Sequence, residues 1–98
     1  MIIDQNGIRT YYKQKIVKEL NWNKISDAQA INNAHGGYII FSDKLLHSGK
    51  ESWKNSREIF VNMNSDFAIE LYKYKNKIPV PIRDIEKLSP IIVKKISK

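Results

Sequence analysis

The sequence predicts an α+β domain with two N-terminal helices, a small, mainly antiparallel sheet and a C-terminal helical segment. Three observations lead to this prediction: apolar residues recur at helical spacing over residues 10–21, a helix-capping motif opens residues 26–34, and apolar and polar residues alternate over residues 57–63. A chain of 98 residues is long enough for one hydrophobic core and too short for two. We therefore expect a single domain that spans residues 1–98.

The N-terminal part is predicted to hold a short arm or strand followed by the first helix. Asn6-Gly7 is a dipeptide suited to positive φ, so residues 1–9 should include a turn. Tyr12, Ile16 and Leu20 then recur every fourth residue, with charged side chains on the opposite face. This spacing predicts an amphipathic helix that ends near residue 21.

The second helix is predicted from its first turn. Ser26 and Gln29 match the S-x-x-Q capping box, in which each side chain bonds to the backbone N–H of the other residue. The helix should end at Gly36-Gly37, because glycine adopts the left-handed conformation that closes a helix. Tyr38–Phe41 follows as a β-branched and aromatic run, which predicts a strand.

The middle of the chain predicts a long loop followed by a β-hairpin. Residues 42–56 are mostly polar and charged, as in exposed loops. Residues 57–63 alternate apolar and polar side chains, and residues 67–74 repeat the alternation after the turn at residues 64–66. These two segments should therefore pair as antiparallel strands.

The structure expected for the C-terminal part depends on its three prolines. Pro79 and Pro81 exclude a central strand and leave an extended edge or connector. Ser89-Pro90 matches an N-cap followed by proline at the first helical position, so residues 91–96 suit a final helix, although their β-branched residues suit a strand equally.

This order of elements is compatible with two nucleic-acid-binding folds. Helix, turn, helix, strand, loop, strand is the order of a winged helix, in which residues 25–32 would form the recognition helix. Helix, three strands, helix is the order of double-stranded-RNA-binding folds and of small ribonuclease toxins built on them. Both remain open from the sequence.

Charge favours an anionic partner. Seventeen Lys and Arg residues against ten Asp and Glu residues give a formal charge of +7, with a pI of about 9.7. Lysine, isoleucine and asparagine are also the residues that an A/T-rich gene encodes by default, so codon bias accounts for part of this charge. That usage fits a low-GC bacterium, or a phage or mobile element living in one.

Composition also excludes several classes of site. The chain has no cysteine, which excludes disulfides and thiolate metal sites. No apolar run approaches the roughly 20 residues of a membrane span, and the N-terminus lacks the pattern of a signal peptide. We expect a cytoplasmic protein of a bacterial host cell, with no metal, no cofactor and no membrane partner.

Two sets of residues are candidates for binding nucleic acid. The first combines amides on the predicted second helix, which would read adenine, with cations of the following loop and strand, which would contact phosphates. Its members are Gln29, Asn32, Asn33, Lys50, Lys54 and Arg57. The second interleaves aromatic and basic side chains, as platforms for single-stranded nucleic acid do. Its members are Tyr72, Lys73, Tyr74, Lys75 and Lys77.

Each candidate also has an ordinary structural interpretation. Short capped helices commonly pack as a pair, tyrosine is common in half-exposed strands, and lysine protects sheet edges from aggregation. Trp53 lies in the most polar stretch of the chain. It would serve there either as an anchor for a protein partner or as a lid on the core.

No catalytic or metal-ligating spacing is recognisable in the sequence. His47 with Lys50, Lys54 and Arg57 is the set that would suit metal-free RNA cleavage. We therefore predict a small noncatalytic nucleic-acid-binding protein, with DNA and RNA both open. The alternatives are a protein-binding inhibitor or adaptor, such as a phage protein that blocks a host defence nuclease, and a small ribonuclease toxin.

Overall fold

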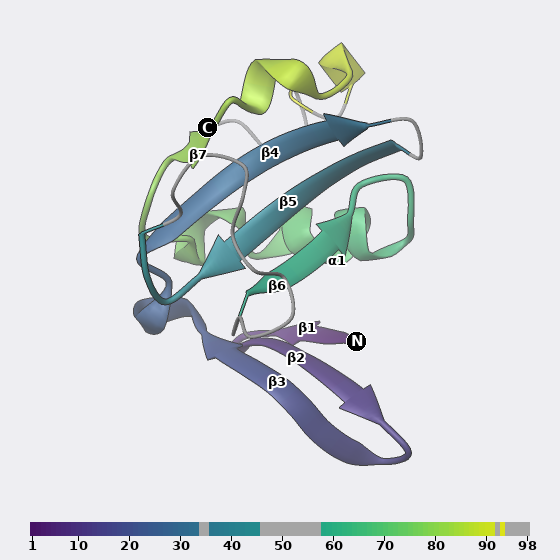
Figure 1. The fold of residues 1–98 in the computed structure, drawn as a ribbon, viewed down its shortest axis with the longest axis vertical. Coiled ribbons are helices and arrows are strands. Elements are labelled where there is room, and N and C mark those ends of the chain that lie inside the picture. The colour runs from purple at the N-terminus through teal and green to yellow at the C-terminus, as the bar shows by residue number, and fades with distance from the viewer. Residues whose placement is uncertain (34–35, 46–57, 92, 94–98) are drawn as a thin grey trace.

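The computed structural model describes residues 1–33, 36–45, 58–91 and 93, which form two β-sheets and one α-helix (Figure 1). Strands are the main element among the described residues, so the fold is mostly β. The predicted fold class, with two N-terminal helices and a C-terminal helical segment, is therefore wrong. Both segments assigned to N-terminal helices are strands.

The first sheet is an antiparallel meander in the order β1-β2-β3. Its strands are β1 (Ile2–Asp4), β2 (Gly7–Tyr12) and β3 (Lys15–Asn21). A two-residue turn joins β2 to β3, and its residues Lys13 and Gln14 have φ of 50° and 66°. Positive φ at both positions is the signature of the type I′ turn, which matches the twist of the flanking strands.

Strand pairing explains why residues 10–21 do not form the predicted helix. A helix would bury Tyr12, Ile16 and Leu20 together, but Leu20 alone of these is buried, while Tyr12 is 67% exposed and Ile16 is 52% exposed. Leu20 instead lies opposite Ile8 in the β2–β3 register, and both side chains enter the core. The pairing of β2 with β3, which buries Ile8 and Leu20 together, therefore determines the structure of this segment, and the helical spacing of its apolar residues does not.

The predicted turn near Asn6 is confirmed, and the backbone that follows it requires glycine at position 7. Gly7 has φ +147°, and a Cβ atom there would lie 2.1 Å from the backbone oxygen of Leu20. The first strand pairs can therefore form only with glycine at this position. Asp4 completes the turn by accepting a 2.8 Å hydrogen bond from the Asn6 N–H.

The second sheet has the order β6-β5-β4-β7, with β4 parallel to β7 and the other pairs antiparallel. Its strands are β4 (Asp27–Asn33), β5 (Gly36–Ser42), β6 (Ile59–Asn62) and β7 (Ile82–Arg83). The short 3-10 helix η1 (Trp22–Lys24) links the two sheets.

The predicted second helix is wrong because β4 pairs with β5 along its whole length. Gly36-Gly37 opens β5 instead of closing a helix. The predicted strand at Tyr38–Phe41 is confirmed within β5. The alternation predicted for residues 57–63 is confirmed in β6, where Ile59 and Val61 are buried and their neighbours are half-buried.

The expected second strand of the hairpin is instead the helix α1 (Phe67–Lys73), which is followed by the 3-10 helix η2 (Lys75–Lys77). Ser65 favours this outcome, because its hydroxyl accepts a 3.3 Å hydrogen bond from the N–H of Phe67 at the helix start. Leu71 is fully buried, and Phe67 and Ala68 pack against the same core. The apolar positions thus follow a helical period.

The proline-rich segment is a connector, as predicted, and it leads directly into β7 and the 3-10 helix η3 (Ile85–Lys87). Beyond η3, the N–H of Val93 donates a 3.0 Å hydrogen bond to the carbonyl oxygen of Ser89. Residue 92 and residues 94–98 lie outside the described part of the chain.

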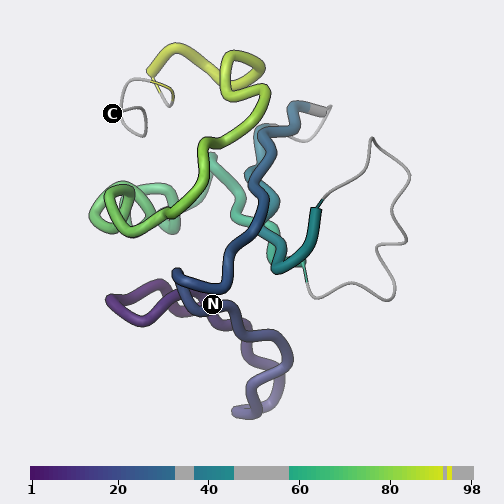
Figure 2. Tube along the Cα trace, turned by 90° about the vertical axis from the view of Figure 1, so that its left-hand side faces the viewer, coloured from purple at the N-terminus to yellow at the C-terminus, as the bar shows by residue number. Residues whose placement is uncertain are grey.

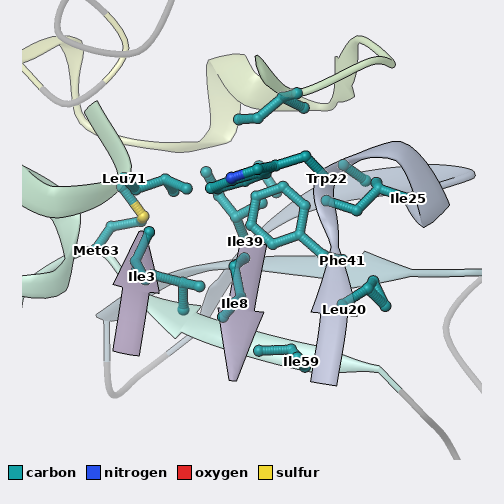
Figure 3. Close-up of a cluster of buried hydrophobic side chains, with 14 of the residues drawn as sticks. Ile3, Ile8, Leu20, Trp22, Ile25, Ile39, Phe41, Ile59, Met63 and Leu71 are labelled. Atoms are coloured by element: carbon teal, nitrogen blue, oxygen red, sulfur yellow. The ribbon is translucent and has the colours of Figure 1, made fainter. Parts of the chain in front are cut away.

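The core lies between the inner faces of the two sheets, with α1 at one side (Figure 3). Its side chains come from both sheets, from η1 and from α1. They include Ile3, Ile8, Leu20, Trp22, Ile39, Phe41, Ile59, Met63 and Leu71. Trp22 is 5% exposed and donates a 2.8 Å hydrogen bond from Nε1 to the carbonyl oxygen of Asp4, which fixes η1 to β1.

Candidate nucleic-acid interface

A two-stranded arm extends from the body of the protein where β2 and β3 pass beyond the core (Figure 2). We define the arm as residues 10–18, which contain three lysines and no Asp or Glu. Burial falls steadily along it, from the buried Ile8 just before the arm to Tyr12 at its end. The arm therefore presents its side chains to solvent rather than to the core.

Large apolar side chains remain exposed on this arm. Tyr11 is 39% exposed, Ile16 52% and Val17 59%. The register shifts between Thr10 and Tyr11, so that Val17 has no direct partner on β2. Such a bulge increases the local twist and makes a flat edge-to-edge pairing with another strand unfavourable. The arm is therefore a poor template for an added strand.

The charges of the arm are not neutralised by the described residues. Lys13 and Lys15 form no ion pair in the described part of the chain, and the Lys13 ammonium lies over the Tyr12 ring at 5.5 Å from its centroid. Lys18 donates a 3.0 Å hydrogen bond to the carbonyl oxygen of Glu58, just before β6. This bond fixes the base of the arm and leaves the two outer lysines free to meet an anion.

Outside the arm, four of the eight described Lys and Arg residues are paired with carboxylates. These ion pairs are Arg9–Asp4, Lys73–Glu70 at 3.1 Å, Arg83–Asp27 at 2.7 Å and Lys87–Asp84 at 3.6 Å. The other four, Lys24, Lys44, Lys75 and Lys77, form no ion pair among the described residues. The arm differs from these surfaces because it gathers three lysines without a carboxylate partner on one short ribbon.

The aromatic and basic residues at positions 72–77 lie on α1 and η2, so the strand platform predicted for them does not exist. Tyr72 is 43% exposed, with the Lys75 ammonium 4.6 Å from its ring centroid. Tyr74 stacks on Trp22, with ring centroids 6.1 Å apart, and Lys73 pairs with Glu70. Of the five candidate residues in this segment, Tyr72, Lys75 and Lys77 remain. Among the described residues, Tyr72 stacks on no other ring, and Lys75 and Lys77 form no ion pair.

Gln29, Asn32 and Asn33 were assigned to a recognition helix, but they lie on strand β4. The prediction that a helix carries these amides into a groove is therefore wrong. Gln29 is half-buried and donates a 2.9 Å hydrogen bond from Nε2 to Asp84 Oδ2. Asn32 is exposed near the end of the strand, and the backbone of Asn33 completes it. They lie on the second sheet, away from the arm. Outside the described residues lie His35, His47, Lys50, Trp53, Lys54 and Arg57.

Among the described residues, Asp84 is the one whose acidity the fold clearly changes. The hydrogen bond from Gln29 and the nearby charge of Lys87 lower the pKa of Asp84 below 3.8. Its φ of 57° is left-handed, a conformation that aspartate and asparagine tolerate better than most residues. This carboxylate joins β4 to the turn after β7 and has a structural role.

The sequence contained a signal for the arm that the helical interpretation concealed. Tyr11-Tyr12-Lys13-Gln14-Lys15 places two aromatic side chains beside two basic ones, a combination that residues 72–77 also contain. The assignment of Tyr12 and Ile16 to a core-facing helix removed them from the list of surface residues. A hairpin with its turn at Lys13-Gln14 would instead have placed Tyr12 and Ile16 near the end of two strands, where side chains are exposed.

Comparisons with protein-family models, curated proteins and solved structures found no match. Within residues 1–33, 36–45, 58–91 and 93, no group of three His, Asp or Glu side chains is placed to hold a metal ion. None of the helices in this part of the chain is long and apolar enough to cross a membrane. The class that the geometry defines is a two-sheet, mostly β protein with a basic projecting arm.

Proposed function

We propose that the protein binds nucleic acid without catalysing a reaction on it, and that the arm is its main contact. The observation that carries this proposal is the combination of uncompensated lysines with exposed tyrosine, isoleucine and valine on one projecting two-stranded ribbon. A ribbon of two strands is narrow enough to enter the major groove of a duplex. Lysines at its end would contact phosphates.

The apolar side chains would contribute in a different way. Tyrosine rings stack on unpaired bases, and aliphatic side chains contact sugars and thymine methyl groups. Tyr12 is the most exposed of the arm's aromatic residues. The arm thus supplies both an electrostatic contact, which is independent of sequence, and a contact with the bases themselves.

Fluorescence anisotropy with labelled single- and double-stranded DNA and RNA tests this proposal. At low salt we expect binding with micromolar or weaker affinity. The double variant Lys13→Gln/Lys15→Gln should reduce the slope of log K against log salt by about 2 for duplex DNA, because each lost phosphate contact removes about 0.9. Tyr12→Ala should weaken binding to single strands more than binding to duplexes.

A matched control removes the same charge from other surfaces. Lys24→Gln/Lys44→Gln changes two exposed lysines outside the arm that, like Lys13 and Lys15, form no ion pair among the described residues, and it should leave the salt slope nearly unchanged. The proposal fails if the protein binds none of the four probes at low salt, or if the control variant reduces the slope as much as the arm variant does.

A further inference from the structure

A polar pocket lies at the opposite end of β2 and β3 from the end of the arm. It forms where the β1–β2 turn and η1 meet the end of η2 and the segment after it, and it has a volume of about 640 Å³. We call it the amide pocket, because four amide side chains line it: Gln5, Asn6, Asn21 and Asn23. The two cations in its wall are Arg9 and Lys77, and none of its lining residues is an Asp or a Glu.

The backbone around the amide pocket is held in place by bonds within the protein. Trp22 donates from its backbone N–H to the Asn6 carbonyl oxygen at 3.2 Å, and its ring nitrogen donates to the carbonyl oxygen of Asp4. Its indole also stacks on Tyr74. These bonds join the β1–β2 turn to η1, so a ligand would have to order only the exposed amide side chains and not the backbone that carries them.

The amide pocket carries net positive charge. Asp4 is not among its lining residues and accepts a hydrogen bond from Nη2 of Arg9. The enclosed Nε of Arg9 has no acceptor among the described residues. Lys77 is exposed and forms no ion pair in that part of the chain, so its ammonium group faces the solvent with its charge uncompensated. An anionic group would be attracted to Lys77.

We propose that the amide pocket binds one nucleotide, with its phosphate at Lys77 and its base edge at the amides. Each amide offers donors and an acceptor, which is the combination that base edges present. The volume lies within the range of about 300–1,000 Å³ of small-molecule sites. The inference rests on the proposed function for its choice of ligand, but the amide pocket contains no residue of the arm.

Titrations followed by NMR test this inference with three probes: adenosine 5′-monophosphate, adenosine and inorganic phosphate. We expect the mononucleotide to bind more tightly than either of its parts, and Lys77→Gln to weaken its binding at least about fivefold. Lys75→Gln removes an equal charge two residues away, outside the pocket lining, and should have little effect. Asn23→Ala should weaken the binding of the mononucleotide but not that of phosphate.

The outcomes separate this inference from the proposed function. Equal affinity for the mononucleotide and for phosphate, or no binding of the mononucleotide, would overturn the nucleotide site. If oligonucleotides bind through Lys13 and Lys15 while the mononucleotide does not bind, the arm proposal stands and the pocket proposal fails. If the mononucleotide binds through Lys77 while no oligonucleotide binds, the amide pocket is a site for a free nucleotide and the arm proposal fails.

Discussion

Arg83 on β7 donates two hydrogen bonds to the carboxylate of Asp27 on β4: Nε to Oδ1 at 3.1 Å and Nη2 to Oδ2 at 2.7 Å. The two residues are 56 positions apart, and they join the parallel pair of strands. The Asp27 side chain is 9% exposed, whereas that of Arg83 is 45% exposed. A nearly buried carboxylate is therefore neutralised by a cation that still reaches solvent.

Removing Arg83 should destabilise the fold through the carboxylate left behind. Breaking a fully buried pair costs about 3–5 kcal/mol, and solvent at Arg83 reduces this. We expect Arg83→Met to lower the free energy of unfolding by about 2 kcal/mol in urea denaturation. Lys87→Met removes a cation from an exposed pair and should cost less than about 0.5 kcal/mol. Equal losses in the two variants would show that burial of Asp27 is unimportant.

Acid should weaken the contact between Asp84 and Gln29. The pKa of Asp84 is lowered in the folded state, so its contribution to stability is fully present above the unfolded value near 3.8. It is lost as the pH falls through the lowered pKa. Asp84→Asn should therefore reduce the pH dependence of the unfolding midpoint below about pH 4, because asparagine tolerates the left-handed backbone but does not titrate.

Glu86→Gln is the control for this pH dependence. It removes a nearby exposed carboxylate that forms no ion pair among the described residues. An Asp84→Asn profile that follows the wild-type profile across the acidic range would contradict the role assigned to Asp84.

The sequence correctly predicted those elements that depend on short-range residue patterns. The β-branched run at residues 38–41, the alternation at residues 57–63 and the turn near Gly7 are all present. The N-terminal strands were missed because their turn consists of Lys13 and Gln14, neither of which is a usual turn residue at positive φ. A spacing of four residues fits a strand as well as a helix when only one end of the strand is buried.

The candidate sites depended on these same assignments. Tyr12 and Ile16 were placed in a core and are exposed on the arm. The amide pocket could not be predicted from the sequence, because its residues come from the first sheet and its β1–β2 turn, from η1, and from η2 and the segment after it, which meet only in the folded protein. Asn6 and Lys77 are far apart in the chain, and neither belongs to a recognisable motif.

Gly7 and Gly37 provide a matched pair of glycine-to-alanine substitutions. At Gly7 the new Cβ would meet backbone at 2.1 Å, and φ is +147°, so neither the contact nor the conformation can relax easily. At Gly37 the nearest atom is the side-chain Cδ2 of Leu88 at 2.7 Å, which can rotate away. We expect Gly7→Ala to cost more than about 3 kcal/mol and Gly37→Ala about 1 kcal/mol in chemical denaturation.

The order of these two losses is the informative result. If Gly37→Ala proves as harmful as Gly7→Ala, the close approach of Gly7 to the backbone of Leu20 does not limit the first sheet.

The turn of the arm should be open to stabilisation. Lys13 and Gln14 both have left-handed φ, which costs a residue with a Cβ about 1–2 kcal/mol. Asn-Gly is the preferred pair for this turn, although glycine loses more entropy on folding. We expect Lys13→Asn/Gln14→Gly to raise stability by about 1 kcal/mol and the melting temperature by about 5 °C in calorimetry.

Single variants separate the turn geometry from the charge. Gln14→Gly keeps both outer lysines, so it should stabilise the turn and leave the salt dependence of nucleic-acid binding unchanged. Lys13→Asn should lower the salt slope by about 1, because it removes one phosphate contact. Gln14→Ala retains a Cβ at the left-handed position and should not stabilise the turn. If Gln14→Ala and Gln14→Gly have equal melting temperatures, backbone strain at this position does not limit the stability of the arm.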